Sequence, residues 1–238
     1  MELYGVALGL GMLSGVAGTG LGVLFSIFVR RVSRAFMGGC ILVSGGVMIA
    51  VVCFDLLPEA LGPGDTGSCF AGIFLGMGLV AGLDALLKAR RRGGDAHLGA
   101  LMAAGIVAHN LPEGLAIGAG LSRSLAFGAG LCLLIALHDL PEGLALGLPL
   151  RRAGMRPLRL LGLVLLLGLP SGLGALVGAA LSVQPALVSL SFGMASGAIL
   201  YIACGELIPS SFSATKERPS GLWLVTGFLA GLLACLFL

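Results

Sequence analysis

The sequence predicts an all-α membrane protein of about eight transmembrane helices. Of its 238 residues, 58% are hydrophobic and only 11% are charged, and the mean hydropathy is +1.08. A soluble chain of this length needs a charged surface around its core, so most of this surface must face lipid. Long apolar stretches and a one-sided distribution of basic residues support the same fold class. The net charge of +3 is too small to indicate a nucleic-acid partner.

The apolar stretches cover the whole chain and leave no room for a soluble domain. A helix needs about 20 predominantly apolar residues to cross the hydrocarbon core of a bilayer. We therefore expect residues 1–238 to form a single transmembrane domain. Its helices are predicted near residues 4–28, 35–58, 67–88, 98–121, 124–148, 157–182, 185–209 and 220–238.

The basic residues predict the orientation of these helices. Thirteen of the 14 Lys and Arg residues follow the first, third, fifth or seventh predicted helix. They are Arg30, Arg31, Arg34, Lys88, Arg90, Arg91, Arg92, Arg151, Arg152, Arg156, Arg159, Lys216 and Arg218. Basic loops face the cytoplasm, so a chain with eight spans would have both termini on the outer side. The expected location is the plasma (inner) membrane, which the chain crosses several times. Arg123, between the fourth and fifth helices, is the exception.

Two pairs of segments repeat within the chain. AHNLPEGLAIG at 108–118 matches LHDLPEGLALG at 137–147, and GVMIAVVCFDLLP at 46–58 matches GAILYIACGELIP at 197–209. The two helices of each pair are expected to cross the membrane in opposite directions. Inverted repeats of this kind build many transporters, with the binding site near the repeat interface.

Glycine is abundant, with 41 residues, and several glycines recur at a spacing of four. Gly11 and Gly15 in the first predicted helix and Gly168 and Gly172 in the sixth are examples. Small residues at this spacing let helices approach closely in lipid. Static close packing and smooth surfaces that slide during transport both account for the pattern.

The first repeated pair carries side chains that bind metal ions. Its polar residues are His109, Asn110 and Glu113 in one copy and His138, Asp139 and Glu142 in the other. In each copy the histidine and the glutamate are four residues apart, so they share one face of a helix. Two imidazoles and two carboxylates offer four ligands to one ion, a set that suits Zn²⁺ and similar cations.

Each copy also contains a proline, Pro112 or Pro141. Proline cannot donate a hydrogen bond to the carbonyl four residues earlier, so we expect each helix to kink and to free a carbonyl beside the histidine. Unpaired backbone groups at membrane depth are tolerated where they line a cavity or are buried in protein.

Acidic residues within the predicted membrane helices further limit the possible functions. A charged side chain at membrane depth costs roughly 3 kcal/mol, and a bound cation offsets that cost for Glu113, Asp139 and Glu142. The alternatives are a polar cluster that only joins helices, a metal-selective channel and an intramembrane zinc hydrolase. The hydrolase would keep a carboxylate free as general base, often within HExxH, whereas each motif here reads HxxxE.

HNLPEG at 109–114 and HDLPEG at 138–143 resemble the paired metal-binding motifs of the ZIP (Zrt/Irt-like) family of metal transporters. The resemblance covers essentially the whole chain. It implies eight helices in an inverted-repeat 3+2+3 arrangement, with helices 1, 4, 5 and 6 moving against helices 2, 3, 7 and 8 during alternating access. It also implies a transporter rather than an enzyme, without a prosthetic group.

The same resemblance assigns roles to individual residues. The first implied metal site consists of Met48, His109, Glu113, His138 and Glu142. A second, adjacent site would use Asn110 and Asp139, with the two glutamates bridging both sites. Ser171 stands where some family members have a glutamate, so we expect the second site to be weak or a transit position only.

The expected substrate is therefore Zn²⁺, carried towards the cytoplasm, with Fe²⁺, Mn²⁺ and Cd²⁺ as further candidates. Imidazole ligands favour such ions over Mg²⁺ and Ca²⁺, which prefer oxygen. The expected partners are the metal ion and the lipid bilayer, and no nucleic acid is expected. Formation of a homodimer is possible and is left undecided by the sequence.

Overall fold

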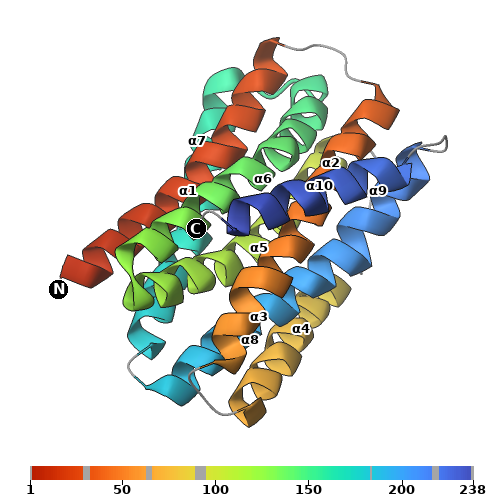
Figure 1. The fold of residues 1–238 in the computed structure, drawn as a ribbon. Helices are drawn as coiled ribbons and strands as arrows, with labels where there is room; N and C mark the ends of the chain where they lie inside the picture. The colour runs from red at the N-terminus through yellow and green to blue at the C-terminus, as the bar shows by residue number, and fades with distance from the viewer. Residues whose placement is uncertain are drawn as a thin grey trace.

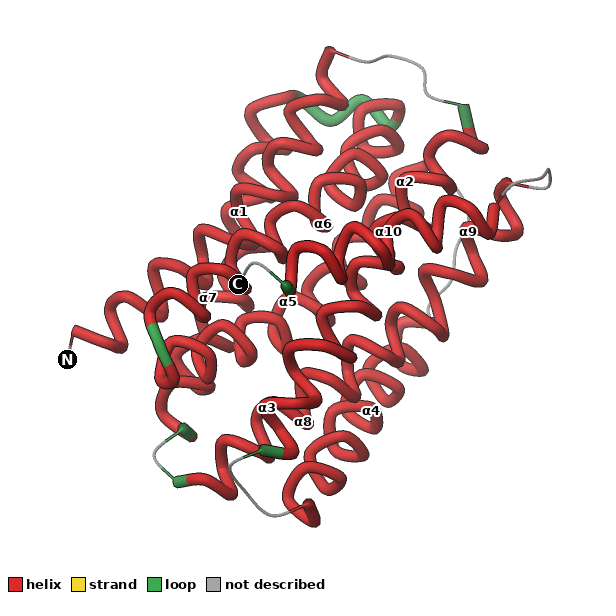
Figure 2. The backbone as a smooth tube through the Cα atoms, viewed as in Figure 1, coloured by secondary structure: helices red, strands yellow, loops and turns green. Residues whose placement is uncertain are grey.

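The structure is a computed structural model that describes residues 2–28, 33–62, 66–88, 95–182, 184–215 and 220–236. Within these ranges every regular element is a helix (Figure 2). The all-α prediction is therefore confirmed. Long helices lie side by side (Figure 1).

Eight helical rods make up the described part of the chain, and their ends lie within a few residues of the predicted ones except at the end of the seventh. The rods are α1 (Glu2–Phe28), α2 (Arg34–Val51) with η1 (Val52–Leu56) and α3 (Leu57–Leu61), α4 (Thr66–Lys88), α5 (Asp95–Arg123), α6 (Leu125–Arg152), α7 (Pro157–Leu181), α8 (Pro185–Ile202) with η2 (Ala203–Leu207) and α9 (Ile208–Thr215), and α10 (Ser220–Cys235).

Six of these rods are long and apolar enough to cross a membrane by themselves. The other two are α5 and α10. The 29 residues of α5 are long enough for a span, but the polar motif at 109–114 lowers its hydropathy. The 16 residues of α10 are strongly apolar but short. Both exceptions have a local cause, so the helix count agrees with a membrane protein of about eight spans.

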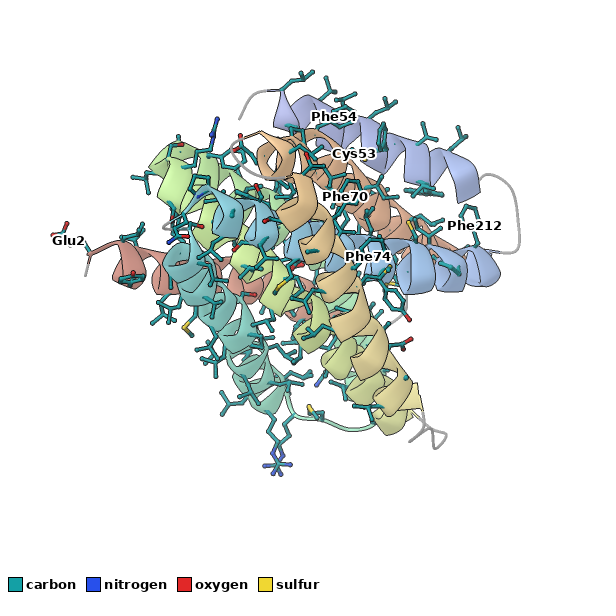
Figure 3. All side chains as sticks on the ribbon, turned by 90° about the horizontal axis from the view of Figure 1, so that it is seen from below. Glu2, Cys53, Phe54, Phe70, Phe74 and Phe212 are labelled. Carbon is teal, nitrogen blue, oxygen red and sulfur yellow. The ribbon has the colours of Figure 1, made fainter. Side chains whose placement is uncertain are left out.

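The outer helices present apolar side chains at their surface. Phe70 and Phe74 project from α4, and Phe54 and Phe212 project from η1 and α9 (Figure 3). Phe74 is 63% exposed and Leu158 in α7 is 81% exposed. Such side chains would be unfavourable in water, and lipid is the solvent that suits them.

The helices form two bundles, which we name here. The motif bundle contains α1, α5, α6 and α7, and the flanking bundle contains α2, α4, α8 and α10 with the short α3 and α9 (Figure 1). In the motif bundle, α1 packs on α6 and α7, and α7 packs on α5. In the flanking bundle, α4 pairs with α8 and α2 pairs with α10.

Glycine permits the closest approaches inside each bundle. A Cβ atom on Gly18 of α1 would lie 2.6 Å from the Cβ of Asp139 and would collide with the backbone of α6. A Cβ on Gly114 of α5 would collide with the carbonyl of Ser171 in α7. In the flanking bundle, Gly76 of α4 lies equally close to Met194 of α8. These contacts bring helix backbones together as small residues do in lipid.

The second repeated pair shares an unusual backbone feature. The rods of α2 and α8 each contain a five-residue π-helical segment, η1 and η2, and each segment ends two residues before a proline, Pro58 or Pro209. A proline removes one helical hydrogen bond, and a wider turn is one way to accommodate that loss. The same feature at equivalent positions supports the repeat found in the sequence.

Candidate metal site

The two motifs are brought together by a helical hairpin with a very short connection. A single residue, Ser124, separates α5 from α6, and its hydroxyl accepts a hydrogen bond from the N–H of Phe127 at 3.0 Å. This N-cap ends one helix and starts the next, so the motifs run past each other in antiparallel helices. Pro112 and Pro141 lie inside helices that continue through them.

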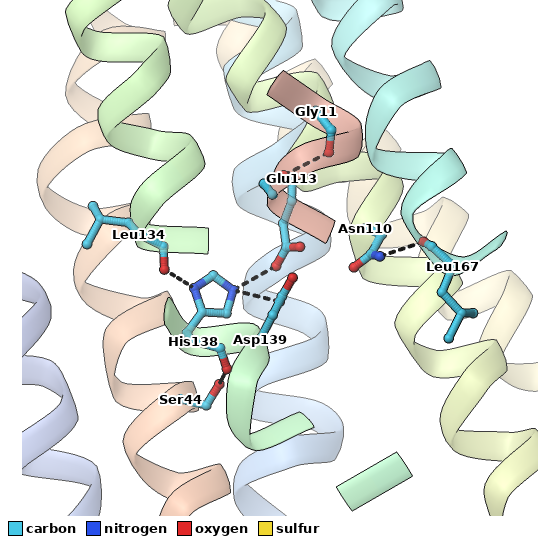
Figure 4. Close-up of polar contacts among 9 residues, drawn as sticks. Gly11, Ser44, Asn110, Glu113, Leu134, His138, Asp139 and Leu167 are labelled. Carbon is cyan, nitrogen blue, oxygen red and sulfur yellow. Dashed lines mark hydrogen bonds and ion pairs between the residues drawn. The ribbon is translucent and has the colours of Figure 1, made fainter. Parts of the chain in front are cut away.

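The centre of the site is a contact between the two copies of the motif. Nε2 of His138 lies 3.0 Å from Oε1 of Glu113 and 3.6 Å from Oδ1 of Asp139 (Figure 4). One ligand atom from each of these three residues lies within 4.8 Å of the others. All three side chains are buried. The arrangement gathers one nitrogen and two carboxylate donors where one cation could reach them all.

The ring of His138 is held from its other side. Its Nδ1 lies 3.1 Å from the carbonyl of Leu134, one turn earlier in α6 (Figure 4). In the tautomer with its proton on Nδ1, the ring would donate to this carbonyl and leave the lone pair of Nε2 available to a cation held between Nε2 and the two carboxylates. A second hydrogen bond of this kind orients most histidines that bind metals.

Two further atoms at the site are buried and accept no hydrogen bond from any described residue, namely Oε2 of Glu113 and Oδ1 of Asn110. A buried acceptor left unpaired costs about 1–3 kcal/mol. The amide nitrogen of Asn110 donates to the carbonyl of Leu167 in α7 at 2.8 Å (Figure 4), which fixes the amide plane. A cation bound at the site could coordinate these two unpaired oxygens.

The remaining predicted site residues are placed as follows. Glu142 is buried in α6, one turn after His138. Ser171 is buried in α7, and a Cβ on Gly15 would lie 2.7 Å from its Oγ and 3.2 Å from Nδ2 of Asn110. His109 belongs to α5, but its side chain lies outside the described residues. Among the predicted site residues, the structure therefore places ligand atoms of Glu113, His138 and Asp139 close enough to bind one ion.

Met48 lies beside the site in the flanking bundle. It is buried in α2 and lines, together with His138, a small cavity between the bundles. The other lining residues are Val51, Leu56, Ala116, Leu131, Ile135 and Ile199. Apart from the imidazole, the walls are apolar, so the polar site borders on a surface without hydrogen-bonding groups.

Sequence reasoning missed one residue at the site. The hydroxyl of Ser44 in α2 donates to the carbonyl of His138 at 2.6 Å, and both are buried (Figure 4). Ser44 lies four residues before Met48 and therefore on the same helix face. That spacing was the signal that could have identified it.

The fold and the site together define a helical membrane protein with buried metal-binding side chains. Residues 88–238 match the family described as ZIP Zinc transporter. The chain is 34% identical over 238 residues to "Zinc transporter ZIPB" of Bordetella bronchiseptica, covering 92% of this chain and 77% of that protein. It is 31% identical over 250 residues to "Zinc transporter ZupT" of Corynebacterium glutamicum, covering 93% and 94%. The chain belongs to the ZIP family of metal transporters, which decides against the hydrolase alternative.

Proposed function

We propose that this protein carries divalent transition metal ions across the membrane, with Zn²⁺ as its main substrate. The observation that carries the proposal is the buried contact of Glu113, His138 and Asp139, whose ligand atoms lie within 4.8 Å of one another. A histidine nitrogen with carboxylate oxygens suits Zn²⁺. The two relatives named above as zinc transporters support the same substrate.

Each side chain has a role in this proposal. His138 supplies Nε2, and Glu113 supplies an oxygen from the opposite motif. Glu142, His109 and Met48 complete the first position, as the family resemblance implies. Asn110 and Asp139 form the second, weaker position, where Ser171 offers a hydroxyl in place of a carboxylate.

Transport would follow from movement of the motif bundle against the flanking bundle. The boundary between them has the properties of a sliding surface, because the cavity that includes Met48 and His138 is lined mainly by aliphatic side chains. The close glycine contacts lie inside the bundles and keep each of them rigid. We further propose that the basic loops face the cytoplasm, that both termini lie outside, and that transport in the plasma membrane runs inward.

The test is metal flux into proteoliposomes that contain the purified protein. We expect saturable Zn²⁺ uptake that Cd²⁺ inhibits and equimolar Mg²⁺ does not, because Mg²⁺ prefers oxygen ligands and binds imidazole poorly. Strong inhibition by Mg²⁺ would contradict the ligand set. Flux that rises linearly with concentration without saturation would favour a channel over a carrier.

A further inference from the structure

Among the described residues, a buried hydrogen bond and an ion pair join the two bundles. The first is the buried hydrogen bond from Ser44 of α2 to the carbonyl of His138 in α6, at 2.6 Å. It joins the flanking bundle to the backbone of a site residue. The carbonyl belongs to the motif helix, so any displacement of that helix along α2 must break this bond.

The second contact lies at one end of the helices. Nε of Arg123, the last residue of α5, lies 3.0 Å from Oε1 of Glu59 in α3. The side chain of Arg123 is 57% exposed and that of Glu59 is 17% exposed. Arg123 is also the basic residue that departs from the one-sided charge distribution, and this ion pair gives it a structural reason for its position.

Three other hydrogen bonds between described helices each stay within one bundle. Asn110 of α5 donates to α7, and the thiol of Cys132 in α6 donates to the carbonyl of Leu10 in α1 at 3.3 Å. In the flanking bundle, Tyr201 of α8 donates to Asp84 of α4 at 3.1 Å. Contacts inside a bundle move with it, so they do not resist displacement of one bundle against the other.

We propose that Ser44 and the Glu59–Arg123 ion pair are fasteners that hold the two bundles in the arrangement seen here. This inference rests on the proposed function, because it assumes that the bundles move against each other. Each fastener must open during a transport cycle. Removing either one lowers the stability of the present arrangement relative to the alternative, and so raises the population of the alternative.

The two fasteners differ in strength. The Ser44 hydrogen bond is buried, and a buried hydrogen bond contributes about 0.5–1.5 kcal/mol, which corresponds to a change of about two- to tenfold in a population ratio. The ion pair is partly exposed to solvent, where such pairs contribute little and are screened by salt. We expect a shift of about twofold from its loss, declining as salt is added.

Distance measurements by pulsed electron paramagnetic resonance test the proposal in the full-length protein. One spin label is placed on each bundle, at Leu86→Cys in α4 and Leu158→Cys in α7, since both side chains are exposed and neither residue belongs to a fastener. The exposed native thiols are removed by Cys53→Ser and Cys204→Ser. The variants Ser44→Ala and Glu59→Gln are then compared in this background.

We expect each variant to raise the fraction of a second label distance, and the double variant to raise it further. Ser196→Ala is the matched control, because its buried hydroxyl donates to the carbonyl of Phe192 within one helix at 2.7 Å. It should leave the distances unchanged. Exchanging the charges with Glu59→Arg and Arg123→Glu should restore the original distribution.

Identical distance distributions in Ser44→Ala, Glu59→Gln and the control would overturn the proposal. A shift in Ser196→Ala as large as that in Ser44→Ala would also overturn it, because loss of any buried hydroxyl would then suffice. Failure of the transport proposal is a separate result, since it appears as absent Zn²⁺ flux in the unmodified protein. The label distances report on the bundles whether or not metal moves.

Discussion

The two copies of the repeated motif have nearly the same sequence but different surroundings. In the α5 copy, Asn110 turns its amide towards α7 and donates to the carbonyl of Leu167. In the α6 copy, the equivalent residue Asp139 directs a carboxylate oxygen to 3.6 Å from the ring of its neighbour His138. At equivalent positions of two similar helices, an amide therefore anchors one copy to its neighbour, whereas an acid provides the other copy with a charged oxygen beside its histidine.

The largest effect should come from removing a carboxylate that faces the other copy. We expect Glu113→Ala to reduce Zn²⁺ uptake to background, because it removes the contact that joins the copies at 3.0 Å. Glu142→Ala should do the same if both copies contribute a ligand. Uptake in proteoliposomes measures the effect, and equal amounts of folded protein must be confirmed by size-exclusion chromatography. Normal Zn²⁺ flux in Glu113→Ala would contradict the site.

A smaller effect should come from making the copies alike. Asp139→Asn gives the α6 copy the amide of the α5 copy and removes a negative charge beside His138. We expect Zn²⁺ affinity to fall about tenfold, the lower end of the range for lost interactions at a metal site. Equilibrium binding to purified protein measures the change. Asn110→Asp is the reverse substitution, and an equal loss there would show that the loss of negative charge does not explain the effect of Asp139→Asn.

Acidic pH should weaken Zn²⁺ binding through His138 of the α6 copy. Metal binding requires neutral imidazole, and an imidazole in water titrates near pH 6.5. Protons therefore compete with Zn²⁺ as pH falls, and the Zn²⁺ affinity should drop between about pH 7.5 and 5.5. Binding isotherms at several pH values measure this, with His138→Gln expected to bind more weakly and with a flatter profile. Affinity that stays constant or rises on acidification would exclude histidine ligation.

The smallest expected effect concerns the helix that supports both copies. Gly15 of α1 lies beside Asn110, and Gly18 lies against Asp139. Gly18→Ala places a methyl group into the backbone of α6, and overpacking of this kind costs about 1–3 kcal/mol. We expect a lower Tm in detergent, by several degrees. Gly78→Ala is the matched control, because a Cβ there meets nothing within 4 Å; equal shifts in both variants would remove the packing explanation.

Much of this molecule was predictable from its sequence. Hydropathy and chain length predicted the helices because lipid permits few alternatives to a long apolar helix. The HxxxE spacing placed the histidine and the glutamate of each motif on one helix face. Two such faces that bind one ion must meet, which predicted the contact of α5 with α6. The contact of His138 with Glu113 in the opposite copy depends on the rotation of two packed helices, which spacing within one helix does not specify.

Other features needed the tertiary structure. Ser44 is an ordinary small residue in an apolar helix, and only the packing of α2 on α6 shows that it donates to a site carbonyl. The ion pair of Arg123 joins residues 64 positions apart, and charge counting marked Arg123 only as an exception. The π-helical segments follow from two prolines, but many prolines in helices produce no such segment, as Pro112 and Pro141 illustrate.

The single residue between α5 and α6 has a consequence for how the protein is made. A helix with an ionised Glu113 enters lipid unfavourably by itself, at roughly 3 kcal/mol on insertion scales. Because only Ser124 separates the two helices, α6 follows immediately and brings His138 to within 3.0 Å of that carboxylate. The acid and the imidazole can then share a proton inside the bilayer. We therefore expect α5 and α6 to be inserted as one hairpin, which neutralises its own polar centre before α1 and α7 close around it.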